Sequence, residues 1–96
     1  MRYHYGIKQL REALLRLSTG HSLEDRLSGA YTELDRIFVE DVITRHYKAI
    51  ELWKADYLTL INSGDVIGSE KQMNKLIQRV VDMAIEVCET NTKLLK

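Results

Sequence analysis

Residues 40–63, EDVITRHYKAIELWKADYLTLINS, decide how the rest of the chain is read. Successive residues of a helix are 100° apart, and on that scale most of the apolar side chains of this stretch fall within one arc of about 130°. They are Val42, Ile43, Ala49, Ile50, Trp53, Tyr57, Leu60 and Ile61, with His46 among them. The pattern predicts an amphipathic helix about 36 Å long that ends before Gly64. In a chain of 96 residues, we expect the other segments to lie along so long a helix.

The segments on either side also have helical periodicity. Apolar residues recur at three-four spacing in residues 6–18, Ser22 is a good N-cap for residues 22–37, and a loop at 62–69 precedes a last helix at 70–94. The chain contains no proline, which favours helices over a turn-rich β protein. We therefore predict an all-α, four-helix bundle-like single domain over residues 1–96, with helices at 6–18, 22–37, 41–63 and 70–94. Gly29 lies inside the second helix, and one explanation is a close backbone approach by a neighbouring helix, which a larger side chain would block.

The junction between the second and third helices contains neither glycine nor proline. If residues 23–61 formed one straight helix, the apolar stripe of 23–38 would point about 130° away from the stripe of 42–61. One core cannot cover both stripes, so we place a break at residues 38–41, with Glu40 and Asp41 in the first turn of the third helix. The alternative is one continuous helix that presents its halves to different partners, for example in a dimer.

The last helix carries a heptad seam with alternating four- and three-residue spacing. The seam consists of Met73, Ile77, Val80, Ala84, Val87, Asn91 and Leu94. Further apolar residues widen the apolar arc of this helix to about 200°, which is more than one small bundle covers. We therefore predict a homodimer with the seam as its oligomer interface. Asn91 either fixes the register of that interface or is exposed to water where the helix frays.

Charge and cysteine content narrow the class of protein. The formal net charge is zero, so the molecule as a whole has no strong attraction for nucleic acid or for an anionic membrane. Residues 1–21 nevertheless hold four basic residues against one acidic residue, a difference that we expect to be neutralised within the fold or across a dimer. Cys88 is the only cysteine, which excludes an intramolecular disulfide. With no membrane-length apolar run and no signal-peptide core, the sequence predicts a cytoplasmic protein without a membrane segment.

His46 lies at the centre of the apolar arc of the third helix. It is a possible buried polar site, with a role as base, metal ligand or pH switch. The alternative is a core histidine whose nitrogens meet a backbone carbonyl or a neighbouring hydroxyl. We favour the alternative because no metal-ligand spacing accompanies His46 and no carboxylate lies three or four residues from it.

Arg16 and His21, in the run RLSTGH, match the Arg-x4-His spacing of the HEPN class of helical ribonucleases, and the pair resembles the motif of that class. The resemblance implies an arginine and a histidine that together polarise and protonate a phosphodiester. In that class the motif begins at the last helix, with a polar residue after the arginine. Here it spans the first helix junction, and Leu17 follows Arg16.

The sequence predicts no other site. It contains no HExxH motif, phosphate-binding glycine loop or cysteine-histidine cluster, so we predict no catalytic residue, cofactor or metal. The leading hypothesis is a non-enzymatic protein–protein interaction or adaptor module that acts as a homodimer on a protein partner. One alternative is a nucleic-acid-associated regulator that uses basic residues of the first helix (Lys8, Arg11, Arg16) or of the last (Lys71, Lys75, Arg79). A second alternative is a hydrolytic or metal-dependent enzyme around His46 or around the pair Arg16 and His21.

Overall fold

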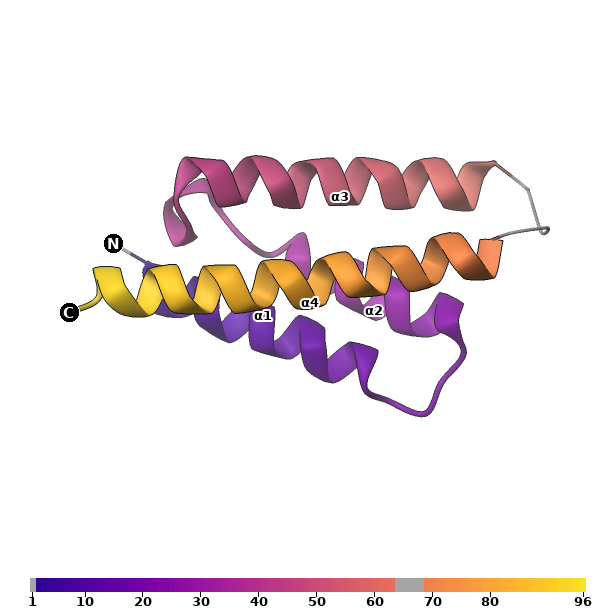
Figure 1. Cartoon of the computed structure of the whole chain (residues 1–96), viewed down its shortest axis with the longest axis horizontal. Coiled ribbons are helices and arrows are strands. Elements are labelled where there is room, and N and C mark those ends of the chain that lie inside the picture. The colour runs from indigo at the N-terminus through magenta and orange to yellow at the C-terminus, as the bar shows by residue number, and fades with distance from the viewer. Residues whose placement is uncertain (1, 64–68) are drawn as a thin grey trace.

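Four α-helices and one short 3-10 helix occur in the described residues (Figure 1). The structure is a computed structural model, which describes residues 2–63 and 69–96. The helices are α1 (Tyr3–Leu17), α2 (Leu23–Leu34), η1 (Val39–Asp41), α3 (Thr44–Asn62) and α4 (Ser69–Leu94). No β-strand occurs in these two described ranges, and the prediction of an all-α protein is confirmed.

The longest helix, α4, contacts each of the other three α-helices. α1 runs antiparallel beside it, which brings the two chain ends to the same end of the molecule (Figure 1). α3 runs antiparallel along another side of α4, and α2 contacts α1, α3 and α4. Together the helices form one globule of 46 × 25 × 18 Å. α4, rather than the predicted third helix, is therefore the element along which α1 and α3 both lie.

The helix ends follow local hydrogen bonds. α1 begins at Tyr3, three residues before the predicted start, because the N–H groups of Tyr5 and Gly6 both donate to the carbonyl of Arg2. The predicted N-cap of α2 is confirmed: the Ser22 hydroxyl accepts a hydrogen bond from the Asp25 N–H at 3.2 Å. The end of α2 was predicted at residue 37, but the helix stops at Leu34.

The predicted break between the second and third helices is confirmed, and the alternative of one continuous helix is wrong. Residues 35–43 separate α2 from α3 and include η1. Asp41 does not begin α3, which starts at Thr44. Its side chain is buried and accepts a hydrogen bond from the Phe38 N–H at 2.9 Å, so Asp41 closes the turn that ends the connection.

Buried apolar side chains from all four α-helices and from the α2–α3 connection form one core. Trp53 of α3 is its largest member, and its indole N–H donates to the carbonyl of Leu76 at 2.9 Å. The Trp53 ring also stacks on Tyr57, with 5.7 Å between ring centroids. The other core residues are Leu10, Ala13, Leu17, Leu27, Ala30, Leu34, Ile37, Val42, Ile50, Val80, Ala84 and Val87.

Gly29 allows a close approach, but the group that approaches it is a side chain and not the backbone that we expected. A Cβ atom on Gly29 would lie 2.5 Å from Nε and 3.1 Å from Cβ of Arg16. The neighbour is therefore a side chain of α1 that lies across the α2 backbone. Arg16 is held on the α2 side of α1 by this contact.

Residues 64–68 of the predicted loop lie outside the described part of the chain. Within the described part, no helix has both the length and the apolar run that a membrane crossing requires.

Candidate functional site

The heptad seam of α4 packs inside this chain. Val80, Ala84, Val87 and Asn91 are at most 1 % exposed, and Met73 and Ile77 are partly buried against the core. Leu94 is the one seam residue that is more than half exposed. The periodicity therefore marks the side of α4 that the chain's own helices cover. Self-association stays a prediction. A dimer contact would need exposed side chains other than the buried residues of the seam.

Asn91 connects three elements of the fold. Its Nδ2 atom donates to the carbonyls of Tyr3 and Asp41, both at 2.9 Å. Because its side chain is fully buried, the interpretation of Asn91 as a wet residue on a frayed end is wrong. Within the chain it sets how α1 and η1 meet α4.

Arg2 and Gly6 complete this contact at the end of the molecule where both chain termini lie. Arg2 Nε lies 3.1 Å from the buried Asp41 carboxylate, close enough for an ion pair although not aligned as a hydrogen bond. Its guanidinium also lies over the rings of Tyr5 and Phe38. A Cβ atom on Gly6 would overlap the Asp41 carbonyl oxygen, so only glycine fits. The cluster is a structural connection, and its polar atoms are turned into the protein.

His46 lies in the first turn of α3 and is 3 % exposed. Neither ring nitrogen has a hydrogen-bond partner among the described residues, so the expected carbonyl or hydroxyl partner is missing there. The nearest carboxylate is that of Glu86 on α4, 3.7 Å from Nε2. Burial, and then the positive charge of Arg45, lower the His46 pKa below its ordinary value of 6.5, while Glu86 opposes them. His46 is therefore a neutral imidazole at pH 7.

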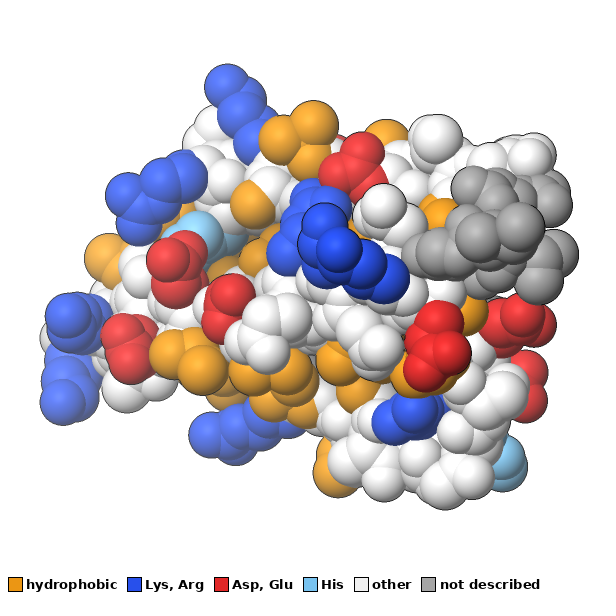
Figure 2. All heavy atoms as spheres, turned by 45° about the vertical axis from the view of Figure 1, so that its right-hand side comes forward, with side chains coloured by type: hydrophobic (Ala, Val, Ile, Leu, Met, Phe, Trp, Pro, Cys, Tyr) orange, Lys and Arg blue, Asp and Glu red, His pale blue; other side chains and the backbone are white. Residues whose placement is uncertain are grey.

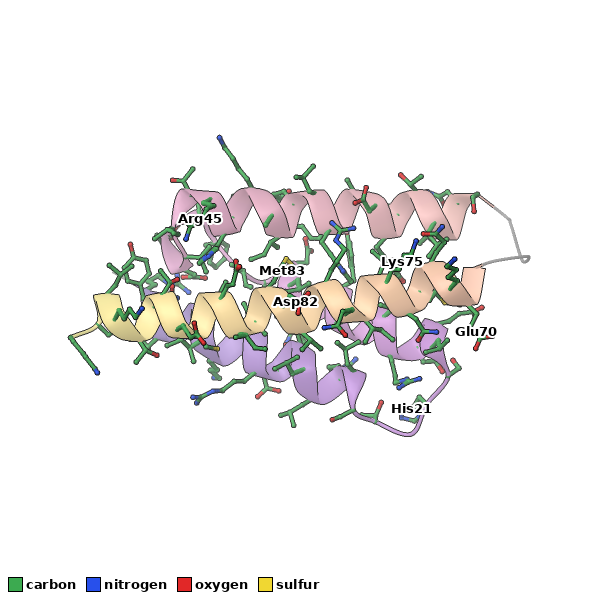
Figure 3. The ribbon with its side chains drawn as sticks, in the orientation of Figure 1. His21, Arg45, Glu70, Lys75, Asp82 and Met83 are labelled. Carbon is green, nitrogen blue, oxygen red and sulfur yellow. The ribbon has the colours of Figure 1, made fainter. Side chains whose placement is uncertain are left out.

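A shallow groove of about 230 Å³ lies between α3 and α4 beside Glu86. Its apolar lining comes from Ala49 and Leu52 of α3 and from Met83 of α4. Figure 3 shows Met83 on the side of α4 that faces α3. His46 does not line the groove, so the buried imidazole and this surface are separate features.

The structure brings Arg16 and His21 to one depression of about 360 Å³ at the α1–α2 connection. Thr19, Asp25 and Ser28 also line it. Figure 3 shows His21 in this connection, below α4 and away from α3. The lining places a guanidinium, an imidazole, a carboxylate and two hydroxyl groups around one space. These groups can bind a small polar anion and exchange a proton with it.

The basic residues named for nucleic-acid binding are divided among several surfaces. In the first helix, Lys8 is exposed on the side away from the core and Arg11 lies within range of Cys88 on α4, whereas Arg16 lies against α2. In α4, Arg79 is paired with Asp56 at 2.8 Å. Lys71 and Lys75 line an open depression with Glu70, Asn74 and Gln78, and Figure 3 shows Glu70 and Lys75 near the beginning of α4. Lys71, Lys75 and Arg79 follow one another at four-residue spacing along α4, and the ion pair with Asp56 offsets the charge at the end of this row.

Metal ligands are not clustered in the described parts of the chain: no group of three or more His, Cys, Asp or Glu side chains is placed to hold an ion. Beside His46 the structure places one carboxylate, that of Glu86, with 3.7 Å between Nε2 and the nearer oxygen, and a zinc site would need at least one further protein ligand.

An exposed apolar strip follows the boundary between α1 and α4, on the side away from the core. Leu15 of α1 is 59 % exposed and Ile85 of α4 is 52 % exposed. Four half-buried apolar residues lie on the same two helices at neighbouring positions of the helical repeat: Ile7 and Leu14 of α1, and Val81 and Cys88 of α4. Figure 2 shows hydrophobic side chains in a broken row across this side of the molecule, with acidic side chains above the row and a basic one below it. We call these six residues the α1/α4 strip.

Cys88 shows that the two edges of the strip meet. Burial raises the pKa of its thiol, and the positive charge of Arg11 on α1 acts in the opposite direction. Arg11 therefore lies close to Cys88. Residues three or four apart share a helix face, so Leu15 and Lys8 lie near Arg11 on α1. On α4, Ile85 is three residues from Cys88, and Glu89 is four residues from Ile85 on the outer edge of the strip.

Comparison of the chain with protein-family models, with curated proteins and with solved structures finds no match. The candidate sites therefore rest on the residues and geometry described above.

The α1/α4 strip is the surface that sequence reasoning missed, although its signal was present. Leu15 falls outside the apolar stripe of α1, and Ile85 falls at the edge of the wide apolar arc of α4. A large aliphatic residue outside the buried stripe of an amphipathic helix indicates a surface contact. The partners of His46 and Asn91 gave no such signal, because Glu86, Tyr3 and Asp41 are distant in sequence.

Proposed function

We propose that this protein is a non-catalytic protein–protein interaction module that works as a homodimer, and that the α1/α4 strip forms the contact between the two copies. The observation that supports it is the strip itself, where Leu15 and Ile85 expose more than half of their surface on adjacent helices. Burying one large aliphatic side chain contributes about 1.5–3 kcal/mol. A dimer would bury four such side chains, one Leu15 and one Ile85 from each copy, which is a substantial driving force for association. A standard protein interface takes about 800 Å² from each partner, which is roughly an eighth of the 6101 Å² exposed here.

Light scattering over a range of protein concentrations tests the proposal. The wild type is expected to reach twice the chain mass of 11.2 kDa. The variant Leu15→Lys/Ile85→Lys is expected to stay at the chain mass, because two charges would be buried without partners. Leu52→Lys is the matched control, since Leu52 is exposed on α3 and lies outside the strip. A wild type that stays monomeric at every concentration would refute the homodimer.

The Arg16/His21 depression supports a second candidate function, hydrolysis of a phosphodiester. Its support is that residues five apart in sequence line one polar depression together with Asp25. The Arg16 guanidinium would neutralise the phosphate, and His21 would protonate the leaving oxygen while water attacks phosphorus. Incubation with single-stranded RNA tests it: cleavage by the wild type that is lost in His21→Ala supports the activity. Equal cleavage by both proteins, or none, removes it.

The nucleic-acid regulator has less support than either proposal. Arg79 is neutralised by Asp56, and Arg16 lies on a different side of α1 from Lys8 and Arg11. A salt-titrated gel-shift series decides the matter, because binding through phosphate contacts weakens steeply as salt rises. Lack of binding even at low salt would dispose of this alternative.

A further inference from the structure

The charges beside the α1/α4 strip indicate how two copies meet. Lys8 and Arg11 border it on α1, and Glu89 borders it on α4. Between Arg79 and Lys93, α4 carries Asp82, Glu86 and Glu89 and no basic residue. Among the ion pairs of the described residues, none uses Lys8, Arg11 or Glu89. Asp82 and Glu86 line the groove on the α3 side, so the charges beside the strip are Lys8 and Arg11 on α1 and Glu89 on α4, which form no ion pair with the described residues.

The register of α1 against α4 places the opposite charges at one level. Asn91 donates to the Tyr3 carbonyl and lies beside Gly6, where an added Cβ would be 2.8 Å from its Nδ2. Because the helices are antiparallel and rise equally per residue, Lys8 lies within about one turn of Glu89, and Leu15 within about one turn of Val81. Lys8 and Leu15 thus each have a complementary residue at a similar position along α4.

Two symmetric arrangements can cover this face with a second copy. If the two-fold axis runs across the helices, α1 lies on the partner's α1 and α4 on the partner's α4. Lys8 and Arg11 then lie on the partner's α1, which carries the same two basic residues, and they cannot pair with the partner's Glu89, which lies on α4. If the axis runs parallel to the helices, between α1 and α4, each α1 lies on the partner's α4. This rotation leaves the position of every residue along the helix direction unchanged, so Lys8 lies opposite the partner's Glu89.

We propose that two copies of this chain pair face to face about a two-fold axis parallel to α1 and α4, with Lys8 opposite the partner's Glu89 and Leu15 on the partner's α4 at the level of Val81. The pairing rests on the proposed function, since it names the occupant and the geometry of the α1/α4 strip. The two-fold axis repeats each contact, so a substitution in the pair acts twice. Both arrangements bury the same apolar side chains. The arrangement with the axis parallel to the helices is favoured because it brings the basic residues of α1 to Glu89 of the partner.

Charge reversal tests the arrangement. Lys8→Glu and Glu89→Lys are each expected to raise the dimer dissociation constant by about tenfold or more, because each turns two attractive contacts into repulsive ones. The double variant Lys8→Glu/Glu89→Lys is expected to return to within about threefold of the wild type. Light scattering or sedimentation gives the dissociation constants, and circular dichroism checks that each variant is folded. Lys48→Glu, on the exposed side of α3, is the matched control and should leave the constant unchanged.

The outcomes separate this pairing from the proposed function. If single reversals change nothing while Leu15→Lys/Ile85→Lys still abolishes the dimer, the strip is the contact but the axis lies elsewhere. If single reversals weaken the dimer and the double variant does not recover, the Lys8–Glu89 contact is wrong. If the wild type never dimerises, the homodimer and the pairing both fail.

Discussion

The two antiparallel contacts of α4 are built from opposite kinds of residue. Against α1, the chain uses Gly6 and Asn91, and the elements are held by hydrogen bonds to backbone carbonyls. Against α3, it uses Trp53, Met83 and His46, and Figure 3 shows side chains filling the space between the two ribbons. The α1–α4 contact depends on the close approach of the two helices, and the α3–α4 contact depends on the volume of large side chains. A close contact tolerates almost no added atom, whereas a contact through bulk fails mainly when volume is removed.

The largest expected effect is removal of bulk at the α3–α4 contact. Trp53→Ala is expected to lower the free energy of unfolding by about 3–5 kcal/mol, because it leaves a cavity and loses the stacking on Tyr57. Urea unfolding at one fixed protein concentration measures it. Leu52→Ala is the control at the neighbouring, 64 % exposed position and should change the free energy by less than about 0.5 kcal/mol. Equal losses in the two variants would mean that Trp53 does not hold α3 in place.

The next effect comes from adding one atom to the α1–α4 contact. Gly6→Ala is expected to cost about 1–3 kcal/mol, since the new Cβ would overlap the Asp41 carbonyl and lie 2.8 Å from Asn91 Nδ2. This cost exceeds the gain of about 1 kcal/mol that alanine brings to a helix interior. Gly20→Ala is the matched control, because a Cβ there meets nothing within 4 Å. Thermal unfolding of the two variants compares them. A Gly6→Ala protein as stable as Gly20→Ala would show that α1 can shift without loss.

Periodicity predicted the features that depend on one helix alone. The helical class, the break after α2, the burial of His46 and the close neighbour of Gly29 all follow from which side of a helix is apolar. The seam of α4 shows where that reasoning stops. Its spacing identifies Val80, Ala84 and Val87 as buried, but it does not tell whether the covering helix belongs to the same chain or to another copy.

The candidate sites depended on partners that spacing cannot supply. Glu86 reaches His46 from another helix, and the carbonyls that Asn91 binds lie 88 and 50 residues away in the chain. The Arg16/His21 pair was visible in sequence because both residues flank one helix junction. Asp25 and Ser28 line the same depression because α2 packs beside α1, which residue spacing alone does not predict.

Substitution of His46 is expected to change the free energy of unfolding least at pH 7. The change becomes measurable only as the pH falls. The folded pKa of His46 is lowered, so between its ordinary value of 6.5 and the folded value the unfolded chain binds a proton that the folded chain does not. The free energy of unfolding therefore decreases as the pH drops through this range. His46→Leu removes the titrating group and its unpartnered nitrogens, so its stability should be near that of the wild type at pH 7 and depend less on pH below 6.5.

Urea midpoints at steps between pH 7 and pH 5 measure this slope, with His21→Gln as a control at an exposed histidine. The slope of the control should match that of the wild type. A His46→Leu protein that retains the full slope would assign the proton uptake to other groups. The α3–α4 contact is filled by large side chains and tolerates leucine in place of the His46 imidazole. The α1–α4 contact depends on hydrogen bonds from Asn91, and no apolar residue can replace it, because two backbone carbonyls would lose their donor.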